Sequence, residues 1–128
     1  MLQALIVDDS KVMREMVIAC LRAHEALSFT QASSGLEALE KLSLQKFDVV
    51  VLDLNMPDIG GYEVIEFIRG QDKLRQLPVL VVTTRGDEGS RARALGAGAT
   101  SFMTKPFLPA ALLGEVRALI GARPGATA

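Results

Sequence analysis

Short runs of apolar residues, many of them β-branched, recur along the chain, and polar or turn-forming residues close each run. The clearest run is Val49–Leu52, which ends abruptly at Asp53. A continuous apolar run of this length predicts a strand that is buried on both faces, as in a parallel sheet. The runs that predict strands are Gln3–Val7, Leu27–Ala32, Val49–Leu52, Val79–Val82 and Thr100–Thr104, of which Leu27–Ala32 is the least clear.

Between these runs, apolar residues recur at the three- and four-residue spacing of helices that pack one face against a core. The predicted helices are Ser10–Ala23, Leu36–Leu42, Tyr62–Arg69, Asp87–Leu95 and Pro109–Ile120. The inward stripe of the first consists of Val12, Met13, Met16, Val17, Cys20 and Leu21, and that of the second of Leu36, Ala38, Leu39 and Leu42. Glycines are expected to end the third helix at Gly70 and the fourth at Gly96 and Gly98.

Strands and helices therefore alternate along the chain with short connections. This alternation predicts an α/β fold with right-handed crossovers and a parallel five-stranded sheet covered by helices on both faces. A chain of 128 residues that is 49% apolar and 23% charged is typical of one globular domain, which we expect to span residues 1–121. Residues 122–128, rich in Gly, Ala and Pro, are expected to form a flexible tail or a linker stub.

Charge and cysteine content narrow the possible partners and setting. The net charge is −1, which gives no electrostatic reason to expect nucleic acid or an anionic membrane surface as a partner. Cys20 is the only cysteine, so no intramolecular disulfide can form, and we expect it to pack in the core. Because the sequence lacks a membrane-spanning apolar stretch and a signal-peptide pattern, we expect a cytoplasmic protein.

Polar and charged residues follow four of the predicted strands directly. They are Asp8 and Asp9, Asp53, Thr83 and Lys105. Parallel strands bring their carboxyl ends to one edge of a sheet, where ligands bind in open α/β folds, so this set can converge. Helix capping is the alternative role for Asp8 and Asp9, although one aspartate would satisfy that need.

The residue types in this set favour phosphoryl chemistry at a metal site. Two carboxylates about 4 Å apart repel by roughly 4 kcal/mol at an effective dielectric of 20, so a cluster of three must take up a proton or a cation. Oxygen donors alone favour a hard cation, and open positions for water and phosphate suit magnesium best. With Asp53 as nucleophile, the Thr83 hydroxyl and the Lys105 ammonium would be partners for phosphate oxygens. The bond between Lys105 and Pro106 is one that can adopt the cis form.

These motifs resemble the receiver domains of bacterial two-component response regulators, in particular the single-domain, CheY-like chemotaxis type. The resemblance rests on Asp8-Asp9, on Asp53 within Asp-Leu-Asn-Met-Pro-Asp, on Thr83-Thr84 and on Lys105-Pro106-Phe107, and it covers about residues 1–121. It implies a doubly wound, flavodoxin-like sheet with strand order 2-1-3-4-5 and five helices.

The resemblance also implies a role for each site residue. Asp53 would accept a phosphoryl group from a sensor histidine kinase or a phosphotransfer protein. Asp9, Asp53 and the backbone carbonyl of Asn55 would bind magnesium directly, and Asp8 would bind it through water. Thr83 and Lys105 would then hold the phosphoryl oxygens. The resulting movement would alter the surface of the fourth helix, fifth strand and fifth helix, which would bind a downstream protein or output domain.

The sequence departs from the family pattern at a few positions. Phe102 stands where the chemotaxis type has a switch tyrosine, so it can rotate inward but offers no hydroxyl. Gly60 replaces a residue that is often acidic. Asn55 and Arg85 lie two residues beyond Asp53 and Thr83, at positions that tune the lifetime of the phosphorylated form in the family. Arg85 would either shield the phosphoryl group or face solvent, and the sequence favours neither.

Two rival functions follow from the same residues. An aspartate-nucleophile phosphohydrolase is disfavoured, because those enzymes typically carry an Asp-x-Asp pattern after the first strand, which this chain lacks. A phosphorylation-independent interaction module is disfavoured because every residue that the site needs is present. The favoured function is a phosphorylation-controlled switch that turns over no external substrate and dephosphorylates itself weakly.

Overall fold

The structure is a computed structural model that describes residues 1–84 and 86–122. Arg85 and most of the predicted tail lie outside the described residues, so the two alternatives for Arg85 stay open. Within the described ranges the elements are β1 (Leu2–Val7), α1 (Lys11–Leu21), β2 (Leu27–Ala32), α2 (Gly35–Leu44), β3 (Val49–Leu52), α3 (Gly61–Gly70), β4 (Val79–Thr83), α4 (Glu88–Ala97), β5 (Ser101–Thr104) and α5 (Pro109–Ala122). No helix among these residues is both long and apolar enough to span a bilayer.

The five described strands form one parallel sheet in the order β2-β1-β3-β4-β5, which confirms the predicted fold class. Val7 at the end of β1 pairs with Leu52 at the end of β3, so the next residues of both strands emerge side by side. On the other side of β3, Thr83 at the end of β4 pairs with Thr104 at the end of β5. The carboxyl ends of these strands therefore share one edge of the sheet.

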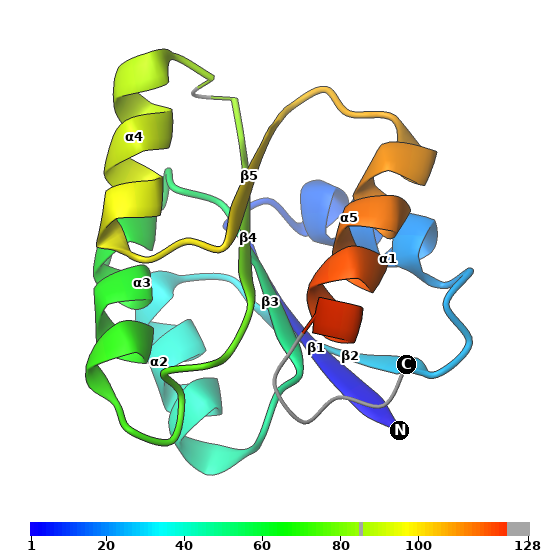
Figure 1. Cartoon of the computed structure of the whole chain (residues 1–128), viewed down its shortest axis with the longest axis horizontal. Helices are drawn as coiled ribbons and strands as arrows, with labels where there is room; N and C mark the ends of the chain where they lie inside the picture. Colours follow the sequence, from blue (N-terminus) through cyan, green and yellow to red (C-terminus); the bar gives the residue numbers. More distant parts are fainter. Residues whose placement is uncertain (85, 123–128) are drawn as a thin grey trace.

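Helices cover both faces of the sheet, with α1 and α5 on one side and α2, α3 and α4 on the other (Figure 1). Because successive strand residues point to opposite faces, each strand contributes to two apolar layers. The layer under α2, α3 and α4 includes Leu5, Val7, Val50, Leu52, Val64, Ile65, Ile68 and Val81. The layer under α1 and α5 includes Ala4, Ile6, Val17, Ile18, Leu21, Val49, Val51, Leu80, Leu112 and Val116.

The inward faces predicted for the first two helices were partly wrong. Val12, Met16 and Leu36 are 72%, 47% and 52% exposed. At 3.6 residues per turn, Val12 lies half a turn away from Leu21, which is fully buried. The buried arc of α1 instead includes Ile18, a residue that the predicted stripe missed. Cys20 is partly buried and packs against the layer under α1 and α5.

The predicted end of the fourth helix was wrong for Gly96, which lies inside α4, and is confirmed for Gly98. The helix ends at Gly98, whose φ of 119° lies in the left-handed region that glycine adopts without strain. The N–H of Gly98 donates to the carbonyls of Ala94 and Leu95, so these two carbonyl groups near the end of the helix have a hydrogen-bond partner. Gly70 is the last residue of α3, where the third helix was expected to end, and α5 includes Ala122.

The first turn of α3 packs directly against the chain that leaves β3. A Cβ atom added at Gly61 would lie 2.6 Å from Cα of Leu54 and 2.7 Å from the carbonyl oxygen of Asp53. The neighbouring Gly60 has no such contact, since its nearest atoms would be 3.9 Å and 4.0 Å away. A side chain at Gly61 would therefore push α3 away from the segment that carries Asp53.

The same loop caps α2. The two carboxylate oxygens of Asp58 accept hydrogen bonds from the N–H groups of Gly35 and Leu36, both at 3.2 Å. Desolvation alone would raise the pKa of Asp58, but bonds from the backbone N–H groups of Ile59, Leu36 and Gly35 outweigh it and hold this pKa below its ordinary value. The positive end of the α2 dipole favours the charged form in the same direction.

We expect Gly61→Ala to lower the free energy of unfolding by about 1–3 kcal/mol, because the methyl group meets backbone atoms that cannot rotate away. Urea denaturation followed by circular dichroism would measure this difference. Gly70→Ala, at the last residue of α3, is the matched control, because an added Cβ would meet nothing within 4 Å there, and we expect it to cause no loss of stability. Equal losses in the two variants would contradict the close packing of α3 on β3.

We expect wild type to be more stable than Asp58→Asn at neutral pH, and the difference to shrink as the pH falls. The lowered pKa means that Asp58 stabilises the fold only while it is ionised, so its contribution is complete above the ordinary value of 3.8 and disappears as the pH falls through the lower folded-state value. Urea denaturation of both proteins between pH 7 and the acid transition measures the difference. A difference that does not depend on pH would contradict the proposed charge–helix interaction.

Candidate functional site

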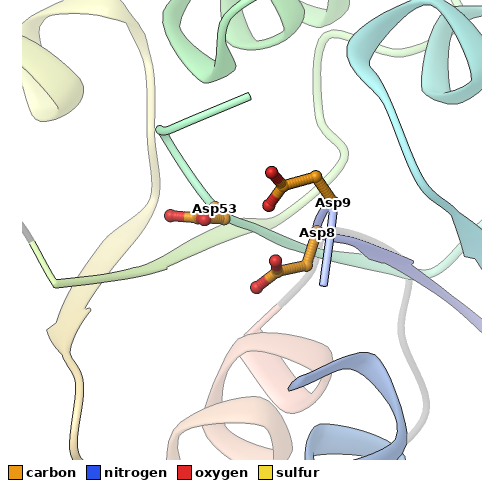
Figure 2. A group of neighbouring side chains, drawn as sticks. All are labelled: Asp8, Asp9 and Asp53. Atoms are coloured by element: carbon orange, nitrogen blue, oxygen red, sulfur yellow. The ribbon is translucent and has the colours of Figure 1, made fainter. Parts of the chain in front are cut away.

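Three carboxylates meet where β1 and β3 leave the sheet. Figure 2 shows Asp8, Asp9 and Asp53 beside one another at the ends of these adjacent strands. One oxygen from each side chain lies within 4.8 Å of the others. Asp8 and Asp53 are buried, and Asp9 is exposed. The convergence predicted from parallel strands is therefore present in the structure.

The backbone around the cluster fixes these positions. The N–H of Asp53 donates to the carbonyl of Val7 at 3.0 Å, which extends the pairing of β1 and β3 to the site. The carboxylate of Asp8 accepts from the N–H of Ser10 at 2.9 Å. Ser10 is the N-cap of α1, because its hydroxyl accepts from the N–H of Met13.

Helix capping does not explain the aspartate pair. Ser10 is the N-cap of α1, and Asp8 accepts from the N–H of this cap residue rather than from a residue of the helix. The side chain of Asp9 has no hydrogen bond or ion pair within residues 1–84 and 86–122.

Lys105, directly after β5, brings a largely buried ammonium group to the carboxylates. Its Nζ lies 2.8 Å from Oδ2 of Asp8 and 3.7 Å from Oδ2 of Asp53, and its side chain is only 10% exposed. The N–H of Lys105 donates to the carbonyl of Thr83 at 2.8 Å, which continues the pairing of β4 and β5. The peptide bond between Lys105 and Pro106 is cis.

The surroundings of Asp53 oppose its charge. Burial is the largest influence and raises its pKa, Lys105 lowers it, and the negative charge of Asp8 raises it. Hydrogen bonds from the Asn55 backbone and the Thr83 side chain lower the pKa less, so the net pKa is raised. A further cation beside Asp53 would reverse this balance by favouring the ionised carboxylate.

The residues present fit a divalent cation. Three carboxylates and one ammonium leave a formal charge of −2, and each carboxylate offers oxygen atoms as donors to a metal. Oxygen donors with room for water are typical of magnesium sites. The backbone N–H of Asn55 lies 3.4 Å from Oδ1 of Asp53, so Asn55 is next to the cluster, and its carbonyl as a ligand stays a prediction.

Two further residues that the sequence analysis assigned to the switch, Thr83 and Phe102, lie in β4 and β5. Thr83 is fully buried at the end of β4. Phe102 lies in β5 opposite Val81, where it is partly buried against the core under α2, α3 and α4.

Arg14 contacts the backbone beside the acidic cluster, which was not predicted from the sequence. A guanidinium nitrogen of this residue lies 2.7 Å from the backbone carbonyl of Asp8. Its position five residues after Asp9 was the available signal, but nothing in the apolar pattern singled it out.

Comparisons with known proteins agree with this geometry. The family model described as the response regulator receiver domain matches residues 4–117. The chain is 30% identical over 121 residues to chemotaxis protein CheY1 of Helicobacter pylori, which covers 94% of this chain and 98% of that protein.

Solved structures are similar over nearly the same span. Chemotaxis protein CheY4 of Vibrio cholerae is 34% identical with a TM-score of 0.85, and the match covers 93% of this chain and 98% of that one. The receiver domain of a sensor histidine kinase from Pseudomonas aeruginosa is 28% identical with a TM-score of 0.86, over 94% and 98% of the two chains. That structure has a magnesium ion coordinated in its active-site cleft.

The family match spans most of the chain, and the similar structures extend over both the sheet and the helices that cover it. The acidic cluster and Lys105 lie at the edge of the sheet where the family resemblance places them. The chain belongs to the response regulator receiver domain family, and it is a CheY-like receiver domain of two-component signal transduction.

Proposed function

We propose that Asp53 accepts a phosphoryl group from the phosphorylated histidine of a sensor kinase or phosphotransfer protein, and we place this exchange in the cytoplasm. The observation that carries the proposal is the position of Asp53, which is buried at a strand end beside two further carboxylates and 3.7 Å from the largely buried ammonium group of Lys105. A structural carboxylate would need one such partner, whereas this arrangement combines a nucleophile, a cation site and an anion partner.

Each residue has a defined role in the proposed transfer. An oxygen of Asp53 forms a bond to phosphorus as the phosphorus–nitrogen bond of the phosphohistidine breaks, so the phosphoryl group moves without net oxidation. Lys105 and the Thr83 hydroxyl bind its oxygens. The residues proposed to hold magnesium directly are Asp9, Asp53 and Asn55, through its carbonyl, while Asp8 would act through water. Bound magnesium would supply positive charge where the transferred oxygens accumulate negative charge.

We further propose that phosphorylation alters the surface formed by α4, β5 and α5, where a downstream protein or output domain binds. Thr83 and Lys105 end neighbouring strands and share a backbone hydrogen bond, so a phosphoryl group held by both would draw these strand ends together. Only Ser90 and Ala94 of α4 are buried, which leaves this helix with few contacts to resist a shift. Phe102 would rotate inward as part of the same change.

Receiver domains are signalling modules, and we propose that the only turnover here is slow self-dephosphorylation of Asp53. Water would have to reach a buried aspartyl phosphate held by Thr83 and Lys105, which favours a long-lived signal over catalysis. Sustained hydrolysis of a phosphate ester in solution would instead support the phosphohydrolase alternative.

Incubation with acetyl phosphate and magnesium is expected to add one phosphoryl group to wild type, because the donor needs only the nucleophile and its charged partners. Intact-mass spectrometry would measure the gain. We expect no gain without magnesium and no gain in Asp53→Asn.

Asp58→Asn is the matched control, since Asp58 lies in the same loop and contacts α2 rather than the cluster. It should gain the phosphoryl group as wild type does. A gain that survives Asp53→Asn would assign the phosphoacceptor role elsewhere. No gain in a folded wild type that binds magnesium would favour the interaction module.

Beryllofluoride, a mimic of the phosphoryl group, tests the switch by amide chemical shifts. With magnesium present, we expect larger changes in β5, α4 and α5 than in α2, because the strand ends that bind the group adjoin those elements. Thr83→Val should keep the changes near Asp9 and Asp53 but lose most of those in β5 and α4. Wild-type changes confined to the loops around the cluster would rule out the proposed switch.

A further inference from the structure

Arg14 connects the start of α1 to the acidic edge of the sheet. One terminal nitrogen of its guanidinium donates to the backbone carbonyl of Asp8 at 2.7 Å, and its Nε donates to the side-chain oxygen of Gln31 at 2.9 Å. The Arg14 side chain is partly buried, and its backbone N–H makes the first helical bond of α1 with the carbonyl of Ser10. Two nitrogens of the guanidinium therefore have fixed hydrogen-bond partners.

The carbonyl of Asp8 needs this donor because the neighbouring strand ends. The pairing of β1 with β2 stops at Val7 and Ala32, and the N–H of Asp8 makes a last bond to the carbonyl of Ala32 at 3.1 Å. Beyond Ala32 the chain turns toward the cap of α2 at Ser34. Arg14 thus supplies the hydrogen bond that a longer β2 would have supplied.

This hydrogen bond fixes the peptide unit between Asp8 and Asp9. The carbonyl of Asp8 and the N–H and Cα of Asp9 lie in one plane, so holding the oxygen also fixes where the Asp9 side chain leaves the backbone. Ser10 and Lys105 hold the carboxylate of Asp8 directly. The carboxylate of Asp9 has no such contact in the described part of the chain, so its direction depends on the backbone.

We propose that Arg14 is a positioning residue for the metal site, which acts by holding the Asp8–Asp9 peptide so that the Asp9 carboxylate points toward Asp53. The proposal rests on the function proposed above, in which Asp9 is a direct ligand of magnesium. Residues that orient metal ligands without touching the metal commonly change metal affinity by tenfold or more when they are replaced.

Two simpler roles for Arg14 make different predictions. If Arg14 acted only as a nearby positive charge, its removal would strengthen the binding of a cation to the cluster. If it served only to join α1 to β2, its removal would lower stability and leave magnesium affinity unchanged. A positioning role alone predicts weaker magnesium binding when the charge is removed.

The experiment compares wild type with Arg14→Gln and Arg14→Lys by calorimetric titration with magnesium chloride at fixed pH and ionic strength. We expect Arg14→Gln to weaken magnesium binding about tenfold. Arg14→Lys should recover part of this loss, because an ammonium can donate to the Asp8 carbonyl but not to Gln31 as well. Arg22→Gln, an exposed position at the end of the same helix, removes the same charge and should change the affinity less than twofold.

Spectra of the metal-free proteins test the positioning step separately from the metal. We expect Arg14→Gln to shift the carbonyl carbon resonance of Asp8 and the amide of Asp9, with smaller shifts at Asp53. Unchanged resonances, or magnesium affinity that is equal or tighter in Arg14→Gln, would overturn the proposal. If wild type itself bound no magnesium, the metal role proposed for Asp9 would fail, while these resonances would still decide whether Arg14 holds the peptide. Should Arg14→Gln not fold, Arg14→Lys and Gln31→Leu supply the same comparison.

Discussion

Three carboxylates held within 4.8 Å of one another repel, and the remaining structure around the site depends on how this repulsion is offset. The fold supplies a largely buried ammonium from the residue after β5, an N–H group from the start of α1 and a hydroxyl from β4. Lys105 lowers the pKa of Asp53 more than Asp8 raises it, and burial is the main reason that this pKa is still raised. The three carboxylates and one ammonium leave a formal charge of −2, which a bound divalent cation would neutralise.

The contacts around the cluster divide into two kinds. Some reach the carboxylates themselves, as Lys105 and Ser10 reach Asp8. Others act on the backbone, as Arg14 does at the Asp8 carbonyl. Among residues 1–84 and 86–122, no side chain contacts the carboxylate of the exposed Asp9, so its direction depends on the backbone at the start of α1 and the edge of the sheet.

Much of this arrangement was predictable from sequence, because it follows from periodicity and topology. The runs that end at Asp8, Asp53, Thr83 and Lys105 identify parallel strands, and parallel strands bring these residues to one edge without further information. The direction in which a helix turns its apolar residues was harder to predict. Val12 and Met16 extend the apolar pattern of α1, yet the angle at which α1 lies on the sheet leaves them exposed. The contacts of Arg14 and Asp58 depend on how α1 packs on the sheet and on the conformation of the loop after β3. Neither can be predicted from the pattern of apolar and polar residues within one segment.

The bond between Lys105 and Asp8 joins residues 97 positions apart, so the first and last strands of the chain must both be in place before the site exists. A nascent or truncated chain that lacks β5 would carry the aspartates without their ammonium partner. If Lys105 binds the phosphoryl oxygens as proposed above, such a chain would also lack one of the groups that the transfer needs.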